Sequence, residues 1–151
     1  MIGLLQRVSS ASVDIDGQRV AQIGAGLMVL IGVEKGDGET EADRLLQRLL
    51  HYRVFADQDG KMNLGLCDVE GGLLLVPQFT LAADTSKGNR PGFSRAAPPE
   101  HAQRLFSYLL RRAGASYPRV ESGRFGEDMQ VGLVNDGPVT FQLRVIADKD
   151  K

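Results

Sequence analysis

The chain has few of the residues that most often carry catalysis. It has a single cysteine, Cys67, which excludes an intramolecular disulfide and fits a reducing cytoplasm. No Cys or His partner stands at ligand spacing, so we expect no metal site and no cofactor. Only two histidines occur, both in predicted helices, and no Gly-x-Ser-x-Gly motif is found. These absences argue against a Ser-His-Asp hydrolase.

Long apolar runs are missing as well. The longest, Ile23–Val33, includes three glycines and is too short to span a bilayer. The first residues lack the layout of a signal peptide, so we expect a cytoplasmic protein. We expect neither a membrane nor DNA as its partner. Aromatic residues make up 6% of the chain, so a stacking platform for single-stranded nucleic acid is not expected.

Length and charge say more. The 151 residues predict one domain, residues 1–147, with a short charged tail at 148–151. The segment Ser86–Arg124 carries eight Lys or Arg residues against two Glu, a net charge of +6, and the remainder is therefore at −7. A basic segment on an acidic chain is typical of contact with a polyanion. Arginines on a solvated helix face are an equal alternative.

Hydrophobic periodicity predicts an α+β fold. We expect a mainly antiparallel curled sheet or small β-barrel with two helices packed on it. The predicted helices are Glu39–Tyr52 and a second one from Pro98 to Ala113, ended by Gly114. The predicted strands lie at Met1–Val8, Ala11–Ile15, Gln18–Ile23, Leu27–Val33 and Gly71–Thr80, with further strands in Tyr117–Val145 separated by turns at Gly123 and Gly137.

Two stretches have unusual backbone chemistry. Gly137-Pro138 separates the apolar runs Met129–Val134 and Val139–Val145, and its simplest interpretation is a β-turn between two strands. At the strand end Pro77–Leu81, backbone groups are expected to lie unpaired at the sheet margin, beside the amide of Gln78 and the hydroxyl of Thr80. Such groups can form an oxyanion hole or hold an ammonium without any titrating residue.

Six short motifs are spread over essentially the whole chain. They are Gln6-Arg7-Val8, Lys61-Met62-Asn63-Leu64, Gln78-Phe79-Thr80-Leu81, Arg90-Pro91, Gly123-Arg124-Phe125 and Asn135-Asp136-Gly137-Pro138-Val139-Thr140. In these motifs, which occur in family order, the chain resembles the D-aminoacyl-tRNA deacylases.

The resemblance implies a homodimeric editing hydrolase that cleaves the ester between a D-amino acid and the 3′-terminal adenosine of tRNA. Glycine, with no side chain, should also be accepted, including glycyl-tRNA mischarged on tRNA-Ala. A cis Gly137-Pro138 pair would reach across the dimer and present carbonyls to the substrate's α-amino group. The pair would thereby reject L-aminoacyl-tRNA.

The family motifs also assign the remaining site residues. The catalytic wall would be Gln78, Phe79, Thr80 and Leu81. Phe125 would line the adenosine pocket, and Arg7 would brace the Gly-Pro loop. Thr80 would position groups rather than act as a nucleophile, because no base is placed to activate it.

One position departs from the family. The first motif usually begins with Ser, whereas this chain has Pro77, which supplies neither a hydroxyl nor a backbone N–H. The chemistry is therefore expected to depend on the backbone around Phe79–Leu81. Two alternatives stay open: a non-catalytic dimeric module that binds tRNA or other RNA through its basic segment, and a small dimeric structural protein.

Overall fold

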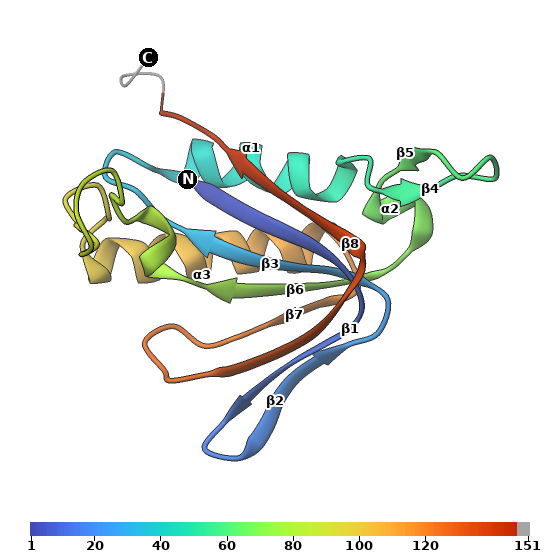
Figure 1. Cartoon of the computed structure of the whole chain (residues 1–151), viewed down its shortest axis with the longest axis horizontal. Helices are drawn as coiled ribbons and strands as arrows, with labels where there is room; N and C mark the ends of the chain where they lie inside the picture. Colours follow the sequence, from blue (N-terminus) through green and yellow to red (C-terminus); the bar gives the residue numbers. More distant parts are fainter. Residues whose placement is uncertain (148–151) are drawn as a thin grey trace.

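A strongly curled sheet with helices on one side forms the body of the protein (Figure 1). The computed structural model describes residues 1–147, and the predicted charged tail at 148–151 lies outside them. The strands are β1 (Ile2–Ile15), β2 (Gln18–Ile23), β3 (Gly26–Gly32), β4 (Phe55–Ala56), β5 (Met62–Leu64), β6 (Gly72–Pro77), β7 (Val120–Ser122) and β8 (Gln130–Arg144). The helices are α1 (Glu39–His51), α2 (Leu66–Val69), the 3₁₀ turn η1 (Phe79–Ala82) and α3 (Pro99–Ser116).

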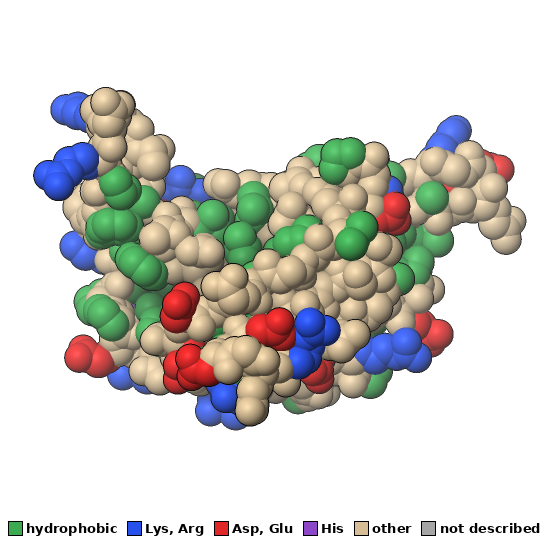
Figure 2. Space-filling view, turned by 60° about the horizontal axis from the view of Figure 1, so that its bottom comes forward, with side chains coloured by type: hydrophobic (Ala, Val, Ile, Leu, Met, Phe, Trp, Pro, Cys, Tyr) green, Lys and Arg blue, Asp and Glu red, His purple; other side chains and the backbone are tan. Residues whose placement is uncertain are grey.

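The sheet is mixed and nearly closed. Its order is β2-β1-β3-β6-β7, and β8 pairs with β1. β1 is antiparallel to β2, β3 and β8, whereas β3–β6 and β6–β7 are parallel. The predicted mainly antiparallel curled sheet or barrel is confirmed. The space-filling view shows one projection at the left and one at the right of the molecule, with hydrophobic side chains exposed on the face between them (Figure 2).

β1 and β8 are longer than the sequence predicts. The two strands expected at Met1–Val8 and Ala11–Ile15 form one strand, because β8 supplies pairing partners to both halves. The other edge of β1 pairs with β3 over Ile2–Val8 and with β2 over Ala11–Ile15. The predicted division into two strands by a β-turn at Gly137 is wrong for the same reason, since both flanking runs belong to β8 and pair with β1.

The two predicted helices are confirmed, and α2 adds a four-residue helix. The predicted end at Gly114 is wrong. The Tyr117 N–H still donates to the Ala113 carbonyl at 2.9 Å, and Tyr117 is buried, so packing carries the helix past the glycine to Ser116. No helix within residues 1–147 is long and apolar enough to cross a membrane.

β6 is buried on both faces. Leu73 and Leu75 pack with residues of α1 and α3, while Leu74 and Val76 point into a second cluster inside the curl of the sheet. Because successive side chains of a strand point to opposite faces, a wholly apolar run is what a strand covered on both sides requires.

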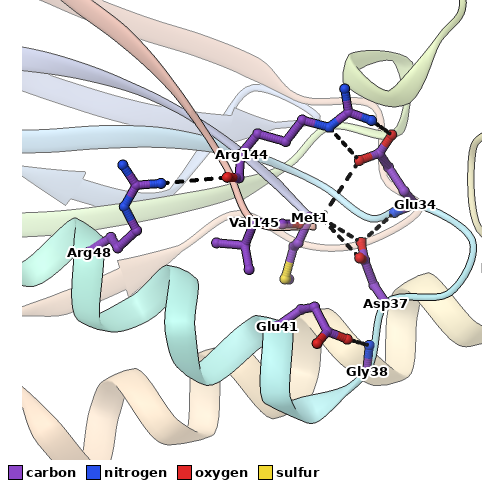
Figure 3. Close-up of polar contacts among 8 residues, drawn as sticks. All are labelled: Met1, Glu34, Asp37, Gly38, Glu41, Arg48, Arg144 and Val145. Atoms are coloured by element: carbon purple, nitrogen blue, oxygen red, sulfur yellow. Dashed lines mark hydrogen bonds and ion pairs between the residues drawn. The ribbon is translucent and has the colours of Figure 1, made fainter. Parts of the chain in front are cut away.

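A charged cluster ties the ends of β1 and β8 together (Figure 3). The ammonium of Met1 is fully buried and donates to Asp37 Oδ1 at 2.9 Å and to the Val145 carbonyl at 2.7 Å. Glu34 lies 3.7 Å from the same ammonium and also pairs with Arg144 at 2.7 Å. Burial raises the pKa of Asp37, although the ammonium and the Glu34 N–H favour its ionised form.

The first parallel pair, β3–β6, depends on a glycine. A Cβ added to Gly26 would lie 2.0 Å from the Gly72 carbonyl oxygen, a backbone atom that cannot move aside. We expect Gly26→Ala to lower the free energy of unfolding by about 3 kcal/mol or more. Gly24→Ala is the matched control, because a Cβ there meets nothing within 4 Å. Urea unfolding that shows equal stability for the two variants would contradict this account of the pairing.

Candidate functional site

The carboxyl ends of the three parallel strands meet at one edge of the sheet, and the Gln78–Leu81 segment begins there. The Gln78 N–H donates to the Ile31 carbonyl at 2.8 Å. The predicted continuation of the strand to Thr80 is wrong. The pairing with β7 ends at Leu75 and the pairing with β3 ends at Pro77, so the chain turns into η1 instead, with the Leu81 N–H donating to the Gln78 carbonyl at 3.2 Å.

Gln78 and Thr80 are joined through their side chains. The amide Nε2 of Gln78 donates to the Thr80 hydroxyl oxygen. The hydroxyl proton of Thr80 is therefore available to a substrate group, since the oxygen already accepts. Among residues 1–147, no titratable side chain contacts this hydroxyl and no group of His, Cys, Asp and Glu could hold a metal ion.

Phe79 and Leu81 point to different surroundings. The Phe79 ring is 60% exposed and contacts the Phe93 ring, with 5.4 Å between their centroids. Leu81 packs against β3, where a Cβ on Gly32 would come within 3.0 Å of the Leu81 Cβ. Gly32 thus lets η1 lie directly against the sheet.

Phe125 follows the neighbouring strand at the same edge. The N–H of Gly123 donates to the Leu75 carbonyl at 2.9 Å. A Cβ on Gly123 would lie 2.7 Å from the Met129 sulfur and 3.5 Å from the Pro77 ring. Pro77 therefore packs against the start of this loop, and Phe125 beyond it is half-buried against the main core.

The Gly137-Pro138 segment is an outward loop within β8. Gln6 pairs with Thr140 and Val8 pairs with Asn135, so four residues of β8 stand opposite Arg7 alone. The Gly137-Pro138 peptide bond is cis, and Gly137 has a φ of +133°. Both residues are exposed on the described chain.

Two side chains hold this loop. Arg7 donates from Nε to the Asp136 carbonyl at 3.0 Å and from Nη1 to the Val54 carbonyl at 2.8 Å. Asn135 accepts from the Val139 N–H at 3.0 Å and donates to the Thr140 hydroxyl at 2.9 Å. The sequence interpretation missed the role of Asn135. A short amide beside Gly-Pro, which readily bonds to nearby backbone groups, is the signal that could have identified it.

The two predicted motifs do not meet within one chain. Arg7 pairs with Leu27 near the start of β3, whereas Gln78 bonds to Ile31 near its end. This offset alone is about 13 Å along the strand. In addition, β8 and β6 lie on opposite sides of the β1–β3 pair. The structure places Gln78, Phe79, Thr80 and Leu81 together at η1, places Phe125 in the loop after the neighbouring strand β7, and separately brings Arg7 to Gly137-Pro138.

Sequence comparisons cover almost the whole chain. Residues 4–144 match the family described as D-Tyr-tRNA(Tyr) deacylase. A D-aminoacyl-tRNA deacylase of Nitrosococcus oceani is 60% identical over 145 residues, which cover 96% of this chain and 94% of that protein. One of Pseudomonas putida is 61% identical over 145 residues, covering 96% of this chain and all (100%) of the relative.

Two solved structures share the fold. The c-Myc DNA Unwinding Element Binding Protein superposes with a TM-score of 0.93 at 37% identity, over 97% of this chain and 100% of that one. A probable eukaryotic D-amino acid tRNA deacylase superposes with a TM-score of 0.75 over 94% and 98% of the two chains. Its identity is 17%, so that likeness shows the fold alone.

The contacts of Asn135 generate a local prediction. In Asn135→Ala the Val139 N–H loses its acceptor, so we expect its hydrogen exchange to accelerate about fivefold, the equivalent of ~1 kcal/mol. The Gly123 N–H, bonded to Leu75 at the far edge of the sheet, is the internal control and should keep its exchange rate. Unchanged exchange at Val139, measured by NMR, would show that the amide does not hold the loop.

Proposed function

The chain belongs to the D-Tyr-tRNA(Tyr) deacylase family and is a hydrolase acting on the ester bond of D-aminoacyl-tRNA, and we propose that two copies of it build each active site together. The observation that carries this proposal is the separation of the two motifs on a single chain. Residues 1–147 would act as one domain, whose Gly137-Pro138 loop enters the site of the partner copy.

The exposed features of β8 support a homodimer. Its outer edge has no pairing partner among the described strands, and its large apolar side chains Val134 and Phe141 are 56% and 40% exposed. A long strand edge with exposed apolar residues favours pairing with another chain. In a two-fold dimer the same contact occurs twice, so each loop could meet the other copy's Gln78–Leu81 segment.

The loop would act as the chiral filter. The Asp136 carbonyl is already bonded to Arg7, whereas neither Gly137 nor Pro138 has a register partner in β1. Their carbonyls could accept the α-ammonium of the substrate. With the ammonium and the ester carbon both fixed, an L side chain would be directed into the loop and a D side chain away from it. Glycine would fit, which extends the proposed substrates to glycyl-tRNA mischarged on tRNA-Ala.

Hydrolysis would take place at Gln78–Leu81. Water adds to the ester carbonyl carbon, the bond to the ribose oxygen breaks, and that oxygen takes a proton, giving a D-amino acid and tRNA. Pro77 has no N–H and the Leu81 N–H is engaged, so the N–H groups of Phe79 and Thr80 are the proposed donors to the developing oxyanion. The Thr80 hydroxyl would orient the water or the vicinal ribose hydroxyl, and Phe125 would line the adenosine pocket.

Stereospecific turnover is the direct test. We expect release of labelled D-tyrosine from D-Tyr-tRNA. L-Tyr-tRNA should be hydrolysed at least roughly 100-fold more slowly, because one misplaced side chain blocks the site. Glycyl-tRNA-Ala should be hydrolysed as well. Equal rates for the two enantiomers would exclude the filter, and tRNA binding without turnover would indicate a binding module instead.

Mixed dimers test the shared site. Gly137→Ala should displace the loop, because its Cβ would lie 2.8 Å from the Val139 side chain at a positive φ. Gln78→Ala/Thr80→Ala removes the side chains of the other motif. Each variant alone should be weakly active, whereas co-refolded mixtures should recover about a quarter of the wild-type activity, since half the dimers then hold one intact site.

A matched control places all three substitutions on one chain and mixes it with wild type. A shared site lowers the activity to about a quarter of wild type, because every mixed dimer is then defective in both sites. Activity that stays near one half would show that each chain carries its own complete site.

A further inference from the structure

The structure divides the basic segment Ser86–Arg124 into parts with different surroundings. The arginines of α3 are engaged with helix side chains: Arg112 pairs with Asp43 at 3.3 Å, Arg111 lies over the Tyr108 ring at 5.9 Å and Arg104 contacts His101 at 3.2 Å. Arg119 precedes β7, beside the start of β6 and therefore at the opposite end of the strands from Gln78. Arg124 faces the β1–β2 hairpin, near Asp16. These positions do not form one surface beside the proposed site.

The remaining basic residues lie on an ordered arm, residues 83–97, which we name the basic arm. The N–H groups of Asp84 and Gly92 donate to each other's carbonyls at 2.7 and 2.9 Å, closing the loop at its base. The Asp84 carboxylate accepts from the Ser86 N–H at 3.0 Å, and the bonds from Ser86 lower the pKa of Asp84. These bonds give the arm a defined shape and leave its tip uncovered.

Two cations project from the tip of the arm. Lys87 and Arg90 are exposed, and neither forms an ion pair or hydrogen bond with a side chain in the described part of the chain. Arg95, nearer the base, is the cation that faces Asp84. Lys and Arg side chains project at the left-hand end of the molecule in Figure 2, the end at which Figure 1 places the loop after β6.

The arm is fixed relative to Gln78–Leu81. Phe93 of the arm contacts the Phe79 ring, and the far end of the arm is held to the end of β3 by the Lys35 N–H to Arg95 carbonyl bond at 2.9 Å. The arm therefore stands directly beside the proposed site of ester cleavage. A substrate whose ester lies at Thr80 must carry its nucleic-acid chain away across a nearby surface.

We propose that the basic arm binds phosphates of the tRNA acceptor end through Lys87 and Arg90, and so guides the 3′ end into the site. The inference rests on the proposed position of the ester at Gln78–Thr80. Unpaired cations on a loop whose base is closed by hydrogen bonds suit a polyanion, because binding replaces counterions without breaking existing ion pairs. The arm contacts phosphates rather than bases, so it favours tRNA over a substrate without phosphates but reads no sequence.

The test compares D-Tyr-tRNA with 3′-O-D-tyrosyl-adenosine, which has no phosphate. In Lys87→Glu/Arg90→Glu we expect kcat/KM for the tRNA substrate to fall at least ~10-fold, mainly through KM. The slope of log kcat/KM against the logarithm of the salt concentration should become shallower by about 1.4. The kcat/KM for the adenosine substrate should equal that of wild type, which also shows that the variant is folded.

The control variant Lys61→Glu/Arg111→Glu changes the net charge equally at two exposed positions outside the arm. It should keep the wild-type kcat/KM on both substrates. Wild-type kinetics of the arm variant on tRNA, an equal loss on both substrates, or an equal loss in the control variant would each overturn the proposal. Failure of the shared dimer site in the mixing experiment leaves these kinetics unaffected, so the two outcomes are distinguishable.

Discussion

The pairing of β1 with β8 is the constraint on which the rest of the structure depends. β8 follows β1 along nearly its whole length, and β1 in turn pairs with β3 through one half and β2 through the other. Because β8 has four residues where β1 has one, the excess must leave the sheet as a loop. Arg7 and Asn135, one on each strand, hold that loop at its base.

The parallel strands determine the structure at the end of the sheet where Gln78–Leu81 lies. β7 pairs with β6 only as far as Leu75 and β3 pairs with it only as far as Pro77, so the chain leaves the ladder at Gln78 and turns into η1. The chain beyond η1 returns as the basic arm, held to the end of β3. Both motifs therefore present backbone groups at points where regular pairing ends, which is where such groups remain free for a ligand.

The buried ammonium joins the chain just after β3 to the chain just after β8, at the end of the sheet where Gln78–Leu81 lies. It holds Val145 after β8 and the Glu34–Asp37 loop after β3, and Glu34 also pairs with Arg144 (Figure 3). The same loop is bridged to Ala96 at the far end of the basic arm. The ammonium, next to the Ile2–Gly32 pair against which Leu81 packs, thus fixes the frame to which the strand ends and the arm are attached.

The sequence alone determined the curled α+β sheet, both long helices and the family, because apolar periodicity and short backbone motifs are local properties. It could not show that Val139–Val145 and Met129–Val134 pair with one strand, since pairing joins residues more than a hundred positions apart. It could not separate Lys87 and Arg90 from the arginines of α3, because only packing decides which cations find partners. The tertiary structure also decided that Gly137-Pro138 and Gln78–Leu81 lie apart on one chain, since their positions along β3 follow from strand register.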